Sequence, residues 1–439
     1  MKRLLEVAII AVCLLFTHSL FSQTYVSGGI YSNTTWFSEN SPYIVTGDIV
    51  LFPDKVLTIE PGVEVKFDGY YTLEIRGTIE AIGNETDSIK FVSNILNEKD
   101  AWNRIQILNS SQNANGLFEF CQVKHSTDGI AVECCWGNED SYISHSLFEN
   151  NTLGLYNYAG WDLPIDNCLF LYNTTAVRSS DKNISNSTFM YNETGIKAER
   201  FTALNCIFQF NDVAIDWNET VGYGELDSCV ITDNILGVRL RGASITNCEI
   251  NNNSIGIITY HESQNFNGNP YYVPIINNSI CDNSDYNIKN GNSYNKDLTS
   301  NCFCISDSAM IEEKLYDGYD NISLGLFNYS IYDITCQTVI ETVIKVGNPQ
   351  VIDDPFINGE NFVVYPNPFD SYFRLNSKNM KRHDVSVRFF NSIGINVGYY
   401  EIFDNEELYI QTDELNSGMY FIQLLVDNKV LDQKKIIKR

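Results

Sequence analysis

Hydrophobic and polar positions recur along the middle of this chain in a frame of about twenty residues. The clearest copy begins at Ile165 and continues through Cys168, Phe170 and Asn173 to Val177. The frame fits eight times, and one position, which we name the anchor, always holds a small residue: Cys121, Ser146, Cys168, Ser187, Cys206, Cys229, Cys248 and Ser279. A repeat of this length predicts a solenoid in which each copy forms one coil.

The spacing inside the frame predicts strands. The positions three before, two after and nine after the anchor are apolar, and in the eighth copy they are Ile276, Cys281 and Ile288. The anchor and the second residue after it are two positions apart, so their side chains lie on the same face of a strand. The apolar positions of the frame are rich in β-branched and aromatic residues, which favours strands with this face turned inward. Five residues after the anchor comes a turn column: Ser126, Asn151, Asn173, Asn192, Asn211, Asn234, Asn253 and Ser284. This column predicts a left-handed bend and amides that bond from coil to coil.

Residues 28–109 continue the periodicity in short alternating runs separated by Gly, Pro and Asp, which predicts the opening coils and an N-terminal cap. The runs Ser41–Asp48, Leu57–Phe67 and Ile75–Ile79 resemble the start of secreted right-handed parallel β-helix proteins of Bacteroidota. With the later coils the resemblance spans about residues 25–336, and it implies the fold rather than an activity.

Residues 301–329 resemble the closing segment of the same proteins. The stretch Ala309–Leu315 is compatible with a helix. Asp317, Asp320 and Asp333 lack the ligand spacing of a known calcium loop, so they predict a turn in a C-terminal cap.

The last segment, residues 361–439, predicts a small immunoglobulin-like β-sandwich, because short alternating strands are joined by Gly, Asn and Asp turns. The blocks Val363–Phe369, Phe389–Gly394, Leu415–Leu424 and Lys434–Arg439 resemble the type A C-terminal sorting domain of the type IX secretion system. The resemblance implies that this domain engages the type IX machinery, carries cargo across the outer membrane and is then removed, often with the cargo attached to surface lipopolysaccharide.

The N-terminus predicts export. Lys2 and Arg3 precede an apolar run, and small polar residues stand before Gln23, as in a cleaved secretory signal. Cys13 lies inside the apolar run, which argues against a lipoprotein, and no later segment predicts a transmembrane span. We therefore expect a signal peptide at 1–22, a capped β-helix at 23–336, a linker at 337–360 and the sorting domain at 361–439, in an extracellular or surface-attached protein.

Composition narrows the function classes. The chain has 439 residues, a formal net charge of -26 and 13% aromatic residues, which excludes disorder and gives no reason to expect nucleic acid as a partner.

The five anchor cysteines are predicted to be buried, reduced thiols, because Ser replaces them in other copies. The expected disulfide partners, with pairing left open, are Cys134, Cys135, Cys302, Cys304 and Cys336.

The sequence contains no phosphate loop, no zinc-protease motif, no nucleophile elbow and no paired-cysteine zinc pattern. Its histidines are scattered, so we expect neither a metal nor a cofactor. Glu199 and Asp216, on consecutive coils, are the only weak candidates for a carboxylate pair of the kind that glycosidases use.

Eight residues after the anchor the frame has Gly or Ala in seven of its eight copies, and Asn287 in the last. The residues that follow this Gly or Ala position predict the most informative surface. Two outward columns are expected: Ala131, Tyr156, Arg178, Lys197, Asp216, Arg239, Ile258 and Lys289, and beside them Glu133, Tyr158, Ser180, Glu199, Asn218, Arg241 and Tyr260. Coils stack about 4.8 Å apart, so the columns form a long, flat strip.

The tyrosines of this strip can stack on sugar rings, and its charged groups can bond hydroxyls or uronates. The predicted binding residues are therefore Tyr156, Tyr158, Arg178, Lys197, Arg239, Arg241 and Tyr260. An ordinary solvated sheet face would have a similar composition. The sequence favours a secreted β-helix for glycan binding, adhesion or scaffolding, and the alternative is a polysaccharide lyase or glycoside hydrolase.

Overall fold

The computed structural model divides the chain into two compact units, Met1–Pro349 and Gln350–Arg439. The division falls within the segment interpreted as a linker. The structure describes residues 23–95, 97–108, 114–133, 141–157, 163–179, 183–198, 200–217, 223–260, 274–329, 336, 362–365, 372–377, 385–391, 396–402, 408–411, 418–426 and 429–438. The predicted signal peptide and the whole predicted linker, residues 337–360, lie outside these residues.

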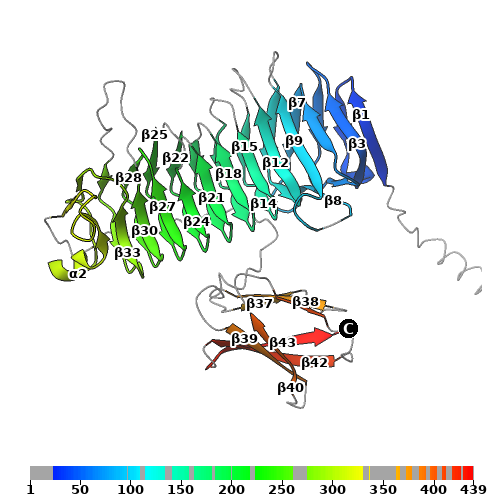
Figure 1. Ribbon diagram of the computed structural model, residues 1–439. Helices are drawn as coiled ribbons and strands as arrows, with labels where there is room; N and C mark the ends of the chain where they lie inside the picture. Colours follow the sequence, from blue (N-terminus) through cyan, green and yellow to red (C-terminus); the bar gives the residue numbers. More distant parts are fainter. Residues whose placement is uncertain are drawn as a thin grey trace, which may run out of the picture. The chain divides into compact units, whose positions relative to one another are not determined.

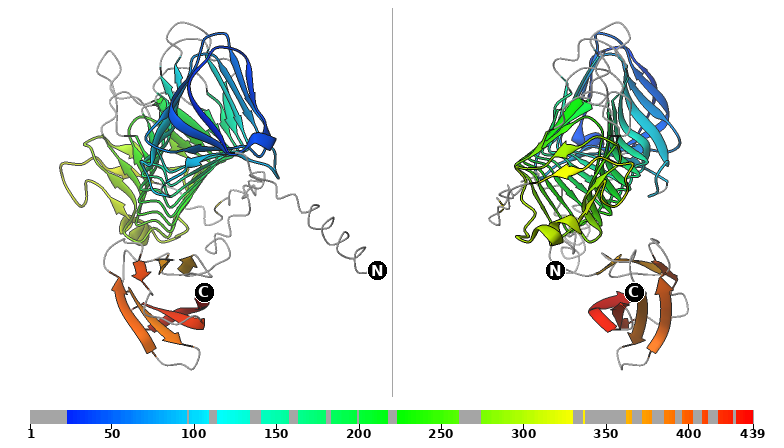
Figure 2. Two further views of the ribbon diagram at one scale, coloured as in Figure 1. Left: turned by 90° about the vertical axis from the view of Figure 1, so that its right-hand side faces the viewer. Right: turned by 60° about the vertical axis from the view of Figure 1, so that its left-hand side comes forward.

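The first unit is a parallel β-helix, as the repeat predicted (Figure 1). A typical coil has three short strands, such as β16 (Ile165–Asp166), β17 (Leu169–Leu171) and β18 (Thr175–Ser179). Each strand pairs in parallel with its equivalent in the next coil, so that Phe170 aligns with Phe189. The first strands of the coils build an eleven-stranded sheet, and Figure 2 shows the coils superposed along the stack.

The opening coils contain β1 (Thr24–Ile30), β2 (Thr34–Trp36), a 3-10 turn (Ser38–Asn40), β3 (Tyr43–Leu51), β4 (Val56–Ile59), β5 (Glu64–Phe67), β6 (Thr72–Ile75), β7 (Thr78–Ile82), β8 (Ile89–Ser93) and β9 (Trp102–Leu108). The first strands of the repeat coils are β10 (Asn115–Glu119), β13 (Tyr142–Ser144), β16, β19 (Asn183–Ser185), β22 (Arg200–Leu204), β25 (Tyr223–Asp227), β28 (Ser244–Thr246) and β31 (Ile275–Ile276).

The second strands are β11 (Cys121–Lys124), β14 (Leu147–Glu149), β17, β20 (Thr188–Met190), β23 (Ile207–Gln209), β26 (Val230–Thr232), β29 (Glu249–Asn251) and β32 (Ser279–Cys281). The third strands are β12 (Ser126–Glu133), β15 (Leu153–Asn157), β18, β21 (Thr194–Ala198), β24 (Val213–Asp216), β27 (Leu236–Leu240), β30 (Ile255–Thr259) and β33 (Tyr286–Asn290).

A stack of phenylalanine rings runs through the core of the middle coils. Phe148, Phe170, Phe189 and Phe208 are fully buried, and consecutive ring centroids lie 4.9, 4.8 and 4.7 Å apart. Burying each ring contributes about 1.5–3 kcal/mol, and each stacked pair adds about 0.5–1.5 kcal/mol. The apolar position two residues after the anchor therefore holds the coils in register.

The asparagine column forms the predicted ladder. Asn192 is buried, its Oδ1 accepts from the amide N of Asn173 at 2.9 Å, and its Nδ2 donates to the carbonyl of Phe170 at 3.0 Å. The left-handed bend, however, lies one residue earlier than predicted. Tyr172 and Tyr191, directly before the ladder residues, have φ of 54° and 56°. The residue before each ladder asparagine adopts the left-handed conformation, and the buried asparagine amide stabilises the bend by hydrogen bonds on its inner side.

The predicted register is confirmed for seven copies and wrong for most of the eighth. Ile250 aligns with Ile280, and not with Cys281. The anchor position is consequently Asn278, whose Oδ1 accepts from the amide N of Cys248 at 2.8 Å, and the ladder residue is Asn283 rather than Ser284. The first strand is shifted too, since Ile275 rather than Ile276 aligns with Ile245. An extra residue before Asn287 restores the predicted register in β33, where Ile288 pairs with Ile257.

The anchor cysteines are buried free thiols, as predicted: Cys121, Cys168, Cys206, Cys229 and Cys248. Burial raises the pKa of Cys168 to about 12, which keeps the thiol protonated. Their sulfurs take part in the backbone bonding of the stack, because the amide N of Cys206 donates to Sγ of Cys229 at 3.4 Å. Ser Oγ accepts the same bond in other coils, which explains why Ser and Cys interchange.

The C-terminal end of the solenoid contains β34 (Lys296–Asp297), α2 (Ser308–Glu312), β35 (Leu315–Tyr316) and β36 (Phe327–Asn328). The helix is shorter than the predicted stretch, and Asp307 caps it by accepting from the amide N of Ala309. Asp317 is fully buried, and its two carboxylate oxygens accept from the amides of Tyr319 and Phe327. This bonding confirms a turn. Asp333 lies outside the described residues.

Two disulfides close this end: Cys281–Cys304 and Cys302–Cys336. Three of their members were predicted. Cys281 was assigned instead to the inward column, an error that follows from the register shift in the eighth copy. Cys134 and Cys135 lie outside the described residues.

The second unit contains two antiparallel sheets, as expected for a small sandwich. One has β37 (Phe362–Tyr365), β38 (Tyr372–Ser377) and β41 (Leu408–Gln411), and the other has β40 (Asn396–Ile402), β39 (Val385–Asn391), β42 (Gly418–Val426) and β43 (Lys429–Lys438). Val387, Phe389, Ile422 and Ile436 are buried in it.

Candidate functional site

The third strands of the coils place one residue each in a continuous column. The register runs from Tyr156 through Arg178, Lys197, Asp216, Arg239, Ile258 and Lys289 to Tyr316 on β35. We name these eight residues the basic column. Its seven steps of about 4.8 Å extend over about 34 Å. The predicted alignment is confirmed throughout, and β35 lengthens it by one residue, Tyr316, which the sequence frame did not reach.

The column concentrates positive charge on an acidic protein. Arg178, Lys197, Arg239 and Lys289 are cationic and Asp216 is the single carboxylate among these eight residues, which gives the column a formal charge of +3, from four positive and one negative side chain, on a chain whose net charge is -26. Arg178 is exposed, and the other three cations are half-buried. A local positive strip of this kind attracts anionic ligands over a range limited by salt screening.

The centre of the column is an ion pair. Asp216 is only 6% exposed, and its Oδ2 accepts from Nη1 of Arg239 at 2.9 Å. The Asp216 Oδ1 has no hydrogen-bond partner among the described residues. A buried carboxylate beside a guanidinium restricts the rotamers of both side chains, so Asp216 positions Arg239.

Aromatic rings flank the cations. The guanidinium of Arg178 lies 5.9 Å from the ring centroid of Tyr156, and that of Arg239 lies 5.9 Å from Tyr260. Farther along, Nζ of Lys289 lies 4.4 Å from the Tyr316 ring. Cation–π contacts at partly exposed sites contribute about 0.5–1 kcal/mol each and hold the cations over the sheet. Tyr260 is 40% exposed, which leaves part of its surface available to a ligand.

Sequence reasoning missed Tyr286 and Tyr316, which both lie by Lys289. Tyr316 follows the end of the repeat, where no frame position predicts its partner. Tyr286 stands directly before Asn287, which occupies the Gly position of the frame. This coil contains an extra residue, so the frame assigned no role to Tyr286. The two rings lie 5.4 Å apart at an interplanar angle of 66°, a contact that depends on the fold and that no sequence pattern indicates.

Two members of the first predicted column are buried rather than exposed. Ala131 is fully buried and Asp216 is nearly so, although both alternate correctly with their neighbours. In the second predicted column Arg241 is half-buried and Tyr260 is exposed. The side chains of Tyr158, Ser180, Glu199, Asn218 and Glu133 lie outside the described residues.

The catalytic hypothesis receives no geometric support from the described residues. A glycosidase pair needs two carboxylates separated by about 5–9.5 Å, and Glu199 lies outside the residues that the structure describes. The other candidate, Asp216, is committed to Arg239. Within the described part of the basic column, the arrangement can hold an anionic chain and orient it.

The C-terminal unit identifies how the protein is exported. Residues 363–439 match the family described as secretion system C-terminal sorting domain. The chain is a type IX-sorted β-helix protein. Its sorting domain indicates export by the type IX system to the cell surface or the extracellular space. No helix among the described residues is both long and apolar enough to span a membrane.

One curated relative shares a short segment with this type IX-sorted protein. Protein bark beetle of Drosophila melanogaster is 34% identical over 59 residues, which is 13% of this chain and 2% of the relative. The chain therefore spans a small fraction of that protein's length.

Proposed function

We propose that this chain is a glycan-binding module that the type IX system delivers to the cell surface or the surrounding medium, and that the basic column holds an extended acidic polysaccharide. The observation that supports this most is the register of Arg178, Lys197, Arg239 and Lys289 on consecutive or nearly consecutive coils of a chain with net charge -26.

The chemistry of the column suits a linear polyanion. Guanidinium groups bond carboxylates and sulfates through two parallel N–H donors, and lysines add point charge. Tyr156 and Tyr260 offer partly exposed aromatic surface beside the cations. The sheet beneath is rigid, so few side chains lose freedom when an extended chain binds along it.

The proposed targeting parts are the signal peptide at 1–22 and the removable sorting domain at 361–439.

The test is a binding and product screen with the purified protein. Alginate represents polyuronates, dextran sulfate represents sulfated glycans, and dextran represents neutral ones. We expect binding to at least one acidic polymer, weaker binding to neutral polymers, a decrease in affinity as salt increases, and no new reducing ends or unsaturated products. Binding to neutral polymers alone, or to none, would refute the proposal.

The alternative, a carbohydrate-active enzyme, predicts product formation in the same screen. In that case Asp216→Asn and Glu199→Gln would separate the roles, because loss of turnover with retained binding assigns catalysis to these carboxylates. Loss of folding in Asp216→Asn would show only the structural role of its ion pair with Arg239.

A further inference from the structure

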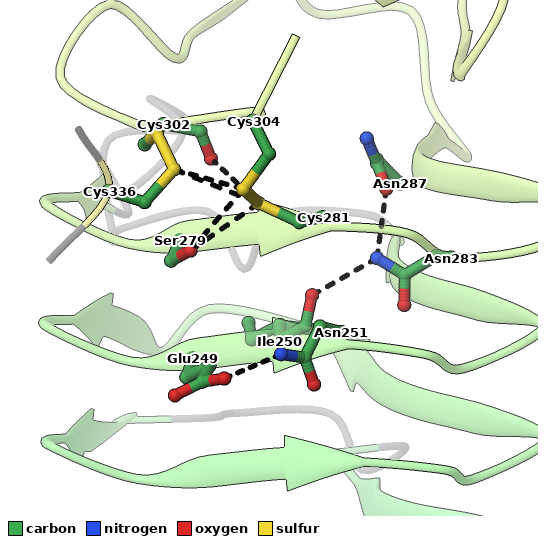
Figure 3. The surroundings of a disulfide bond; sticks show 10 residues. All are labelled: Glu249, Ile250, Asn251, Ser279, Cys281, Asn283, Asn287, Cys302, Cys304 and Cys336. Carbon is green, nitrogen blue, oxygen red and sulfur yellow. Dashed lines mark hydrogen bonds between the residues drawn. A yellow bond between two sulfur atoms is a disulfide. The ribbon is translucent and has the colours of Figure 1, made fainter. Parts of the chain in front are cut away.

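Four cysteine sulfurs meet at the C-terminal end of the solenoid (Figure 3). Cys281 ends β32, Cys302 forms a bridge with Ser279 on the same strand, Cys304 follows two residues later, and Cys336 arrives from farther along the chain. The two disulfides they form lie against each other. Sγ of Cys336 is 3.0 Å from Sγ of Cys304 and 3.8 Å from Sγ of Cys281, neither of which it is bonded to.

One separation in this arrangement already matches that of a tetrahedral thiolate site. Four sulfurs bound to Zn²⁺ at about 2.3 Å lie about 3.8 Å from one another. The separation between Cys281 and Cys336 is already 3.8 Å, and the sulfurs of Cys281, Cys304 and Cys336 all lie within 4.8 Å of one another. Among the described residues, these three form the one group of at least three His, Cys, Asp or Glu side chains close enough to share an ion.

We propose that Cys281, Cys302, Cys304 and Cys336 bind one Zn²⁺ ion when they are thiols, and that zinc and the two disulfides are alternative occupants of one position. The newly made chain starts in the thiol form. Binding releases four protons and gives a Zn(S-Cys)₄ centre of charge -2. Oxidation by a disulfide-containing oxidant instead removes four electrons and four protons, which pass to two equivalents of that oxidant, and forms the two disulfides.

Either occupant has the same mechanical effect. Cys281 belongs to the last complete coil, so each occupant fastens Cys336 to that coil. Zinc would do this before disulfides form. The chemistry favours a thiophilic ion, because soft thiolate ligands select Zn²⁺ over Mg²⁺ or Ca²⁺.

The test compares reduced and oxidised full-length protein. The chain is purified without metal, and one half is kept reduced with a phosphine. Both halves are titrated with Co²⁺ as a spectroscopic substitute and with Zn²⁺ in competition with a coloured chelator. We expect about one Co²⁺ per reduced chain, with sulfur-to-cobalt charge-transfer bands and tetrahedral d–d bands that Zn²⁺ abolishes, and no binding by the oxidised chain.

The five anchor thiols provide matched controls because they are free in both halves. Cys304→Ser with Cys336→Ser should lose the cobalt bands, whereas Cys206→Ser with Cys229→Ser should retain them. Circular dichroism verifies that each variant is folded. Absence of binding by the folded, reduced chain would overturn the proposal, and so would cobalt bands that survive the first pair or disappear with the second. If the first pair does not fold, a raised melting temperature of reduced wild type with Zn²⁺ decides the question, since no shift rejects the site.

Discussion

Replacing one ladder asparagine with leucine tests the stacking of the coils. Asn211 accepts from the amide N of Asn192 at 2.9 Å and donates from Nδ2 to the carbonyl of Phe189 at 2.9 Å and to Oδ1 of Asn234 at 3.0 Å. Asn211 is buried, so Asn211→Leu keeps the bulk but leaves the Asn192 amide and the Phe189 carbonyl without these partners. Each orphaned buried group costs about 1–3 kcal/mol, which gives a destabilisation of about 2–6 kcal/mol.

Hydrogen exchange followed by mass spectrometry is the suitable assay, because a solenoid loses stability locally before it unfolds as a whole. Peptides that contain Asn192 should exchange about 25-fold faster or more in the variant. Thr175→Leu is the matched control, because it also replaces a polar residue with leucine. Thr175 is half-buried and lies one coil away from Asn192. Its expected effect is within about 0.5 kcal/mol. Equal effects of the two substitutions would refute the ladder.

Three further outcomes are expected. Burial lowers the pKa of His125 from 6.5 to about 4, aided by Lys124 and opposed by Glu149. The unfolded chain therefore binds a proton that the folded chain does not, and the stability present above pH 6.5 is lost as the pH falls to about 4. The partly exposed ring limits this loss to on the order of 1–2 kcal/mol, and unfolding curves of His125→Gln at neutral and acidic pH should differ less than those of wild type. Cys206 should react with a thiol probe only after unfolding, and labelling of the native protein would contradict its burial. Deleting residues 361–439 should leave the β-helix folded but confined to the periplasm, and normal surface display would refute the role of the sorting domain.

The repeat could be predicted from the sequence because its inward positions recur with two periods, two residues within a strand and about twenty residues from coil to coil. Phe170 and Asn173 have fixed neighbours in the next coil, so a single alignment predicted the aromatic stack and the amide ladder. The reading failed where one residue was added. In the eighth copy the anchor is Asn278, whose Oδ1 accepts from the amide N of Cys248 as Cys or Ser does in the other coils. The frame expected Cys or Ser at this position, so it selected Ser279 instead.

The site was predictable in alignment but not in contacts. The sequence placed Arg178, Lys197 and Arg239 in one column, yet the burial of Asp216 and its ion pair depend on how the outward side chains pack. The cysteine cluster was hidden for a different reason. Its disulfides join residues 23 and 34 positions apart, a spacing that follows from the path of the closing segment and from no local motif.

The most direct test of polyanion binding by the basic column is the affinity for alginate and dextran sulfate after removal of two of the column's charges. Arg178→Gln with Lys197→Gln removes them without breaking the ion pair of Asp216. Lys55→Gln with Lys296→Gln changes the net charge equally but lies outside the column. We predict that, at unchanged melting temperature, the first pair weakens binding to the acidic polymer at least about tenfold, or 1.4 kcal/mol, and the second less than about twofold. Equal losses in the two pairs, or no loss in the first, would contradict it.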